Sequence, residues 1–247
     1  MSEERTAYLP CKVLTMPQGS HEWFQAKLGI PSASQIYKII TPLGKPTANA
    51  ARRRYALDLA VERITKRPTE TCCTFAMQRG KDMEPLARMW YYCQTRTPVQ
   101  EVGFCVTLDG LTGCSPDGLV GDDGMIEVKC PGIAHYCEIV ADGEIPTDWL
   151  LQCHHALYVT GRRWIDFVLF TDVEPFDGWI KRVERDAVMC GNIHAAVQDF
   201  STEVENMASA IIAGAKLTPD KLEFPAPVFN EEGEEVMTTG TMEGSEL

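Results

Sequence analysis

The chain has 247 residues, of which 45% are hydrophobic and 23% charged, a balance typical of a globular protein with a substantial buried core. It contains no apolar stretch of the roughly 20 residues that a membrane-spanning helix needs. Its first residues, MSEERTAYLPCK, also lack the profile of a secretory signal. We therefore expect a cytoplasmic protein with no membrane partner.

The formal net charge of −12 is unfavourable for binding DNA over the whole molecular surface. Much of the negative excess lies in residues 220–247, which contain eight acidic residues and one lysine. We expect one domain over residues 1–219 and an acidic, disordered tail over residues 220–247. The rest of the chain can still form a locally positive groove.

Ten cysteines are scattered through the chain without any C-x-x-C pair. Zinc sites need closely spaced ligand pairs on short loops, and disulfides are rare in the cytoplasm. The cysteines are therefore interpreted as reduced core residues. His154 and His155 are adjacent on a predicted helix, where their side chains point about 100° apart, so they cannot hold one metal ion together.

Two short helices are predicted near the start of the chain. Ser20 is a suitable N-cap and Gly29 a suitable terminator for a helix over residues 21–28. A second helix is expected to begin near Ser32. Its buried residues are three isoleucines: Ile36, Ile39 and Ile40.

Two longer helices are predicted over residues 48–64 and 75–94, and apolar residues at helical spacing indicate the buried face of each. In the first helix that face is formed by Leu57, Val61 and Ile64. In the second helix it is formed by Met83, Leu86, Ala87 and Trp90. Pro85 lies inside the second helix and implies a kink or a restart.

The apolar pattern changes to short β-branched runs after residue 98. Three antiparallel strands are predicted over residues 99–106, 111–120 and 125–130, because Asp109-Gly110 and Asp122-Asp123-Gly124 are hairpin signals. The later elements are helices over 134–141 and 147–159, the latter ending at Gly161, then strands over 164–170 and 179–183, and a helix over 186–216. This order predicts an α/β (α+β) fold with a central mixed sheet flanked by helices.

The residues with the clearest chemistry lie on two of these strands. Asp117 is placed near the end of one strand, beside a glycine that permits a close approach of the backbone. Glu127 and Lys129 lie two residues apart on the next strand and therefore share one face. The apolar residues that alternate with them point to the core.

A divalent cation between Asp117 and Glu127 would offset the cost of placing ionisable groups among apolar ones. Oxygen ligands favour Mg²⁺ or Mn²⁺ over zinc, and Lys129 would orient water and stabilise charge on a phosphate. The alternative from spacing alone is a solvent-facing strand with a weak surface ion pair. The S-P-D-G sequence one tight turn earlier favours the catalytic interpretation.

Five sequence blocks, in order, carry a family resemblance: W-x3-K-L-G-I-x-S-A-S (23–34), R-G-K-D-M-E-P (79–85), C-S-P-D-G (114–118), I-E-V-K-C-P (126–131) and W-L-L-Q (149–152). The spacing D-x9-E-V-K resembles the PD-(D/E)XK nuclease signature. Over residues 23–170 the chain resembles the phage lambda exonuclease and YqaJ-type viral recombinase family. The resemblance implies a restriction-endonuclease-like core.

The resemblance also implies a role for each matching residue at the catalytic centre. Asp117 and Glu127 would be catalytic metal ligands, completed by the carbonyl group of Val128. Glu84 would be a further catalytic acid and metal ligand, close to a second ion or to the catalytic Lys129. Two Mg²⁺ (or Mn²⁺) ions per site would serve the hydrolysis of a phosphodiester.

A further set of residues is implied to bind the DNA end. The pocket for a terminal 5′-phosphate would be lined by Lys27, Ser34, Ser115 and Gln152. The family has an arginine where this chain has Lys27, which attracts phosphate without the bidentate geometry of arginine, so a requirement for a 5′-phosphate stays open. Met77 matches the position of an apolar wedge that separates the terminal base pair, and a core position on its helix is the alternative.

The function implied by the resemblance is a 5′-to-3′ exonuclease that acts on linear double-stranded DNA, releases mononucleotides and leaves a 3′ single strand for recombination. The resemblance also implies a ring-shaped homotrimer, a single-strand annealing protein as partner, and the bacterial host cytoplasm for a phage-encoded chain. Alternatives are a structure-specific or restriction-type endonuclease on the same core and a non-catalytic DNA-binding module. An iron–sulfur nuclease is disfavoured because no cluster of three cysteines follows the E-V-K strand.

Overall fold

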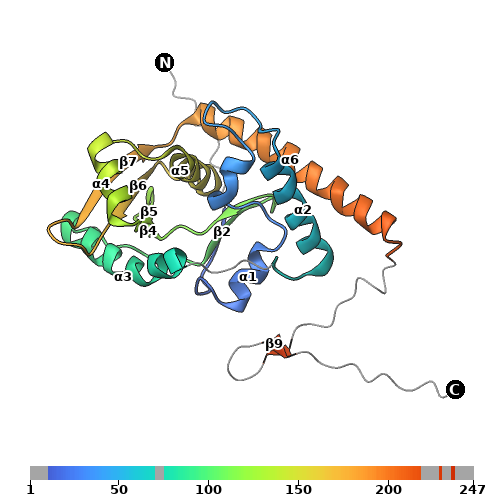
Figure 1. The fold of residues 1–247 in the computed structure, drawn as a ribbon, viewed down its shortest axis with the longest axis horizontal. Coiled ribbons are helices and arrows are strands. Elements are labelled where there is room, and N and C mark those ends of the chain that lie inside the picture. Colours follow the sequence, from blue (N-terminus) through green and yellow to red (C-terminus); the bar gives the residue numbers. More distant parts are fainter. Residues whose placement is uncertain (1–10, 70–74, 218–227, 230–234, 237–247) are drawn as a thin grey trace.

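Two β-sheets joined by a short segment form the centre of the fold (Figure 1). The computed structural model describes residues 11–69, 75–217, 228–229 and 235–236. The smaller sheet is antiparallel, in the order β1-β2-β3, and is formed by Cys11–Leu14, Phe104–Thr107 and Gly113–Cys114. The larger sheet has the order β4-β5-β6-β7 and is formed by Gly118–Val120, Gly124–Lys129, Trp164–Phe170 and Gly178–Glu184. Strands β5 and β6 are parallel and the other neighbours antiparallel, which confirms the predicted mixed sheet.

Helices surround these sheets. In chain order they are α1 (His21–Lys27), the 3₁₀ helix η1 (Ala33–Lys38), α2 (Ala50–Thr65), α3 (Phe75–Thr95), α4 (Ile133–Asp142), α5 (Thr147–Thr160) and α6 (Ala187–Gly214). Of the predicted tail, the structure describes only β8 (Val228–Phe229) and β9 (Glu235–Val236), which pair antiparallel; the rest of that prediction lies outside the described residues. None of the described helices combines the length and apolar character needed to cross a lipid bilayer.

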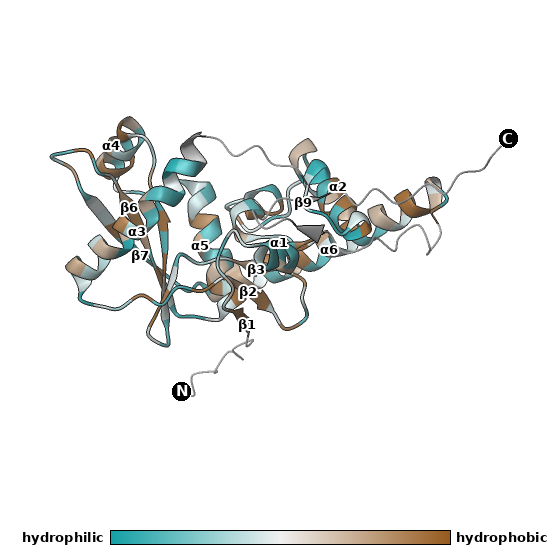
Figure 2. Ribbon diagram, turned by 90° about the horizontal axis from the view of Figure 1, so that it is seen from below, coloured by the Kyte–Doolittle hydropathy of each residue, from teal (hydrophilic) through white to brown (hydrophobic). Residues whose placement is uncertain are grey.

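Strands β4, β5 and β6 of the larger sheet are buried on both faces. On one face, Ile126 and Val128 belong to a core cluster with Ala87 of α3. On the opposite face, Met125 and Phe167 belong to the main core, which includes residues of α4, α5 and α6. Figure 2 shows the result in colour, with brown apolar residues along β6 and teal polar residues on α1 and α2. Burial on both faces explains the nearly continuous apolar runs of this sheet.

The predicted three-stranded meander is divided between the two sheets, so this prediction was wrong. The run over residues 111–120 breaks at Ser115-Pro116-Asp117, where proline has no N–H to offer a β-ladder. The turns were predicted correctly, because β2 pairs with β3 across Asp109-Gly110 and β4 pairs with β5 across Asp122-Asp123. Asp117 consequently lies in the junction between the sheets, directly before β4 and not near the end of a strand.

The buried face of α2 was predicted only in part, since Ile64 of the predicted stripe packs against the main core. The residues that the structure buries are Tyr55, Ala56, Leu59 and Ala60, whereas Val61 of the predicted stripe is 37% exposed. Tyr55 stacks on Phe200 of α6, with ring centroids 5.5 Å apart. Packing on a helix far away in the sequence therefore selects the buried face.

The buried face of α3 was predicted only in part. Met83 and Ala87 are buried as expected, whereas Leu86 is exposed. Tyr91 is buried as well. The Tyr91 hydroxyl donates a 2.7 Å hydrogen bond to Asp166 of β6. The helix continues through the proline at position 85, so of the two predicted alternatives, a kink or a restart, the restart does not occur.

Helix ends follow the predicted signals. The Ser20 hydroxyl accepts a hydrogen bond from the Trp23 N–H at the start of α1, and Gly161 ends α5 with a φ of +68°. The helix predicted to begin near Ser32 is instead a six-residue 3₁₀ helix. All three predicted core isoleucines are buried, and two of them, Ile39 and Ile40, lie after the end of this helix.

Candidate active site

Asp117 lies where the two sheets meet, between β3 and β4. The next residue, Gly118, packs so closely that an added Cβ atom would lie 2.0 Å from Val99 Cγ1, as expected for a glycine at a close backbone approach. The Asp117 Oδ2 atom accepts a 2.6 Å hydrogen bond from the backbone N–H of Val128. This bond ties the junction to β5, the strand that carries the next two candidate residues.

Glu127 and Lys129 lie on the same face of β5. Glu127 is only 3% exposed. Its Oε1 atom accepts hydrogen bonds from Lys129 Nζ over 2.6 Å and from Gln152 Nε2 of α5 over 2.5 Å. A buried carboxylate needs such partners, because an isolated charge is strongly unfavourable in apolar surroundings. This burial excludes the alternative of a weak ion pair on a solvent-facing strand.

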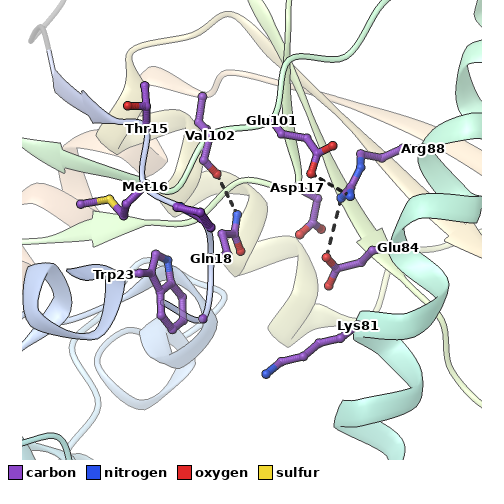
Figure 3. A pocket seen from close by; sticks show the side chains of 12 residues that line it. Thr15, Met16, Gln18, Trp23, Lys81, Glu84, Arg88, Glu101, Val102 and Asp117 are labelled. Carbon is purple, nitrogen blue, oxygen red and sulfur yellow. Dashed lines mark hydrogen bonds and ion pairs between the residues drawn. The ribbon is translucent and has the colours of Figure 1, made fainter. Parts of the chain in front are cut away.

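Glu84 reaches the site from α3. Its carboxylate lies 3.7 Å from Arg88, one turn further along the helix, and Arg88 also forms a 2.9 Å ion pair with Glu101 (Figure 3). Burial raises the pKa of Glu84, Arg88 opposes this shift, and Glu127 reinforces it. Glu84 is therefore part of the same electrostatic cluster as the carboxylate on β5.

The carboxylates of this cluster repel one another. Burial raises the pKa of Asp117 well above its ordinary value, and Glu127 and Glu84 raise it further. Burial alone would lower the pKa of Lys129, but Glu127 and Asp117 raise it above the ordinary value. The shift of Asp117 shows that the neighbouring positive groups do not fully compensate its charge.

The residues present suit a hard divalent cation. Asp117, Glu127 and Glu84 supply carboxylate oxygens, and Val128 supplies a backbone carbonyl group, which are the ligands that Mg²⁺ and Mn²⁺ prefer. Within the described residues, both hydrogen bonds to the Glu127 carboxylate end on Oε1, so Oε2 is available to an ion. No three acidic, histidine or cysteine side chains form a ready-made cage in the described part of the chain, so these ligands would turn toward an ion as it binds.

A cavity of about 210 Å³ brings the candidate residues together. It is lined by Glu84, Asp117, Glu127, Val128, Lys129, Lys27, Ser34, Ser115 and Gln152, with Trp23, Ser32 and Ala33 completing the wall. Nine of the ten residues proposed from the sequence therefore surround one space. The tenth is Met77, whose side chain lies outside the described residues. Its proposed role as a wedge therefore stays a prediction.

Part of the cavity wall is built around Trp23, a residue for which the sequence motifs suggested no role of its own. Its indole N–H donates to Ser115 Oγ over 2.9 Å and to the Gly103 carbonyl group over 3.0 Å. The Lys27 ammonium group lies 3.6 Å from the centroid of the indole ring. Burial lowers the pKa of Lys27 to about 8, so this lysine loses its charge in the mildly alkaline range.

A larger cavity of about 530 Å³ adjoins the first, since Trp23, Glu84 and Asp117 line both. Figure 3 shows Lys81 and Arg88 projecting from the same helix as Glu84 along one side of this space. Arg88 had no part in the sequence-based prediction. Its position one helical turn after Glu84 is the signal that would have found it.

Comparisons with known proteins point to one family. Residues 22–163 match the model of the YqaJ-like viral recombinase domain. Two crystal structures of LHK-Exo, an alkaline exonuclease from Laribacter hongkongensis, one of them in complex with dAMP, are 34% identical to the chain. Each match covers 81% of this chain and 100% of the LHK-Exo chain, with a TM-score of 0.72.

A further solved structure shows likeness of fold alone. The phage-related exonuclease from Haemophilus somnus 129PT is 16% identical to the chain, with a TM-score of 0.57. The match covers 74% of this chain and 96% of that chain. A search of curated proteins found no significant match.

Proposed function

Because the chain belongs to the YqaJ-like viral recombinase family and is a nuclease of the exonuclease type, we propose that it is a metal-dependent 5′-to-3′ exonuclease on linear double-stranded DNA. Its core is PD-(D/E)XK-like, as the sequence predicted. It would release mononucleotides and leave a 3′ single strand for recombination. The observation that carries the proposal is the 210 Å³ cavity, where the acidic cluster adjoins the ammonium, hydroxyl and amide groups of a phosphate pocket.

The acidic cluster would hold the metal ions. Asp117, Glu127 and the Val128 carbonyl group would bind one Mg²⁺ (or Mn²⁺) ion, and Glu84 would help to bind a second. Bound divalent ions supply electrostatic stabilisation to the attacking and leaving oxygens of phosphodiester hydrolysis. The protein contributes the placement of the ligands: the Val128 N–H orients Asp117, and the two hydrogen bonds to Oε1 orient Glu127.

Lys129 has the charge and the position for a catalytic role. The surrounding acids Glu127 and Asp117 raise its pKa, so it stays protonated throughout the neutral and mildly alkaline range. Its ammonium group lines the same cavity as the metal ligands. There it can donate hydrogen bonds to the attacking water and to an oxygen of the scissile phosphate.

The terminal 5′-phosphate would bind to Lys27, Ser34, Ser115 and Gln152. Ser115 Oγ accepts a hydrogen bond from Trp23, so its own hydroxyl hydrogen can be donated to a phosphate oxygen. Because η1 has only six residues of 3₁₀ helix, recognition by Ser34 would depend on its hydroxyl group and not on a helix dipole.

Assembly and partners extend the proposal by analogy with the family. We infer a ring-shaped homotrimer around DNA, a single-strand annealing protein as partner, and the bacterial host cytoplasm as the location of a phage-encoded chain. A ring retains DNA by topology, so weak contacts suffice and the net charge of −12 is tolerated. Light scattering tests the inferred trimer: a particle with the mass of one chain would contradict it.

The proposal is tested with Mg²⁺ and linear duplexes that carry a label at one end and either a 5′-phosphate or a 5′-hydroxyl. Loss of the 5′-phosphorylated strand, with the label released as a mononucleotide, is the expected result. Degradation from the 3′ end would overturn the polarity. Cutting of covalently closed circles would favour the endonuclease alternative. Full activity in EDTA would contradict the proposed metal dependence.

Replacing Lys27 by Ala is expected to lower kcat/KM on 5′-phosphorylated duplexes about tenfold and to leave 5′-hydroxyl duplexes almost unchanged. In the native protein this preference should fade as the pH rises through about 8, because the free enzyme loses the Lys27 charge above its pKa. Lys27→Arg should keep the preference at higher pH, since the guanidinium group stays charged. The measurement is kcat/KM on both duplexes from roughly pH 7 to 9.5, and a preference in the native protein that is constant over this range would contradict the assignment.

A further inference from the structure

A buried chain of hydrogen bonds lies behind the phosphate pocket. Thr112 Oγ1 donates to the Pro31 carbonyl group over 2.7 Å and lies 2.8 Å from His155 Nε2. Thr112 and His155 are both 0% exposed. The carbonyl oxygen carries no hydrogen, so the hydroxyl hydrogen points to it, and the hydrogen between Thr112 and His155 must come from Nε2.

These contacts give the chain a fixed direction, from the His155 N–H through the Thr112 hydroxyl to the Pro31 carbonyl group. Burial lowers the pKa of His155 to about 3, so its ring is neutral at physiological pH. With the hydrogen on Nε2, the other ring nitrogen, Nδ1, is a bare acceptor, and it has no hydrogen-bond partner among the described residues. We call these three groups the relay.

Each member of the relay lies three residues along the chain from a candidate phosphate ligand. The pairs are Pro31 with Ser34, Thr112 with Ser115, and His155 with Gln152. The relay therefore joins three segments that form the cavity wall: the start of η1, the region of β3, and α5. The Gly113 N–H also donates a 3.1 Å hydrogen bond to the Pro31 carbonyl group, which strengthens the connection between the region of β3 and the start of η1.

We propose that Thr112 and His155 are positioning residues, which fix the relative placement of Ser34, Ser115 and Gln152 and thereby set the KM for a 5′-phosphorylated end. That the bound group is a 5′-phosphate rests on the proposed function, whereas the fixed arrangement of the cavity wall does not. Without the Thr112 hydroxyl, a buried N–H and a buried carbonyl lone pair lose their partner, and the segments would shift to satisfy them. Small displacements of binding groups weaken binding of the phosphate they hold.

The test compares Thr112→Val, which removes the hydroxyl at nearly constant shape, with Thr112→Ser, which keeps it. Tyr158→Phe is the matched control, because it removes a part-buried 2.8 Å hydrogen bond between α5 and His194 Nδ1. Thr112→Val is expected to raise the KM for 5′-phosphorylated duplexes about tenfold, with kcat within about twofold of native. Amide hydrogen exchange over residues 32–38 should accelerate about tenfold. Thr112→Ser and Tyr158→Phe should stay close to the native protein.

Native KM and native exchange in Thr112→Val would overturn the proposal, as would a loss confined to kcat or a loss matched by Tyr158→Phe. If the native protein does not distinguish 5′-phosphate from 5′-hydroxyl ends, the phosphate part of the proposed function fails. The relay then stands if Thr112→Val still accelerates exchange and raises the KM for DNA ends, and falls if it does neither. If Thr112→Val does not fold, His155→Gln, which retains an N–H donor, is compared with His155→Leu, and equal KM values in the two would sink the idea.

Discussion

Asparagine in place of Asp117 is expected to lower kcat by about a thousandfold or more at saturating Mg²⁺, because a ligand of the first proposed ion would lose its charge. The fold should tolerate the change, since an amide oxygen can still accept the 2.6 Å hydrogen bond from the Val128 N–H. Initial rates on a 5′-phosphorylated linear duplex measure the effect. Asp123→Asn, in the exposed turn between β4 and β5, is the matched control and should leave the rate unchanged.

The same substitution separates catalysis from stability. The pKa of Asp117 is raised in the folded protein, so above the ordinary carboxyl pKa the ionised group destabilises the fold, and this penalty is present at neutral pH. Asp117→Asn removes it, and the Tm at neutral pH without metal is expected to rise. Added Mg²⁺ should raise the Tm of the native protein and not that of the variant. An Asp117→Asn protein that is within tenfold of native activity, or that Mg²⁺ stabilises as strongly, would contradict the metal site.

Replacing Lys129 by Met is expected to lower kcat about a hundredfold with little change in KM, because the ammonium group would act mainly on charge that develops in the transition state. The variant also leaves the buried Glu127 carboxylate without its 2.6 Å cationic partner, so its Tm should fall in the absence of metal. Mg²⁺ should restore part of that loss, since the ion would supply positive charge at the same carboxylate.

Lys181→Met is the matched control for this change, because Lys181 forms a 2.7 Å ion pair with Glu144 away from the cavity. It should leave kcat and the response to Mg²⁺ unaltered. Lys129→Arg tests whether positive charge alone is sufficient, and partial recovery of kcat is expected. A Lys129→Met enzyme with native kcat would show that the lysine serves only to keep Glu127 buried.

The parts of the fold that could be predicted depend on local signals. Ser20 and Gly161 delimit their helices because a cap hydroxyl and a left-handed backbone act within a few residues. The alternation of Glu127 and Lys129 with apolar neighbours likewise follows from the two-residue period of a strand. That period is sufficient by itself to place both charged residues on one face of β5.

The parts that were missed depend on partners far away in the sequence. Phe200 of α6 decides which side of α2 is buried, and Leu86 of the face predicted for α3 is 54% exposed. Strand β1 has only four residues and is a strand because it pairs with β2, from Cys11 opposite Thr107 onward. Arg88 was missed although its position one helical turn after Glu84 is a local signal, whereas its ion pair with Glu101 depends on the fold.

The long-range contacts at the sheet junction also determine when the site is complete. Trp23 and Ser115 are 92 positions apart, and Gln18 bonds the Pro116 carbonyl group from 98 positions away. Contacts between such distant residues form late, because a long loop must close before they can contribute. A chain still on the ribosome and shorter than 152 residues also lacks Gln152, which holds the Glu127 carboxylate. Synthesis from the N-terminus would therefore complete the site only after residue 152 has emerged from the ribosome.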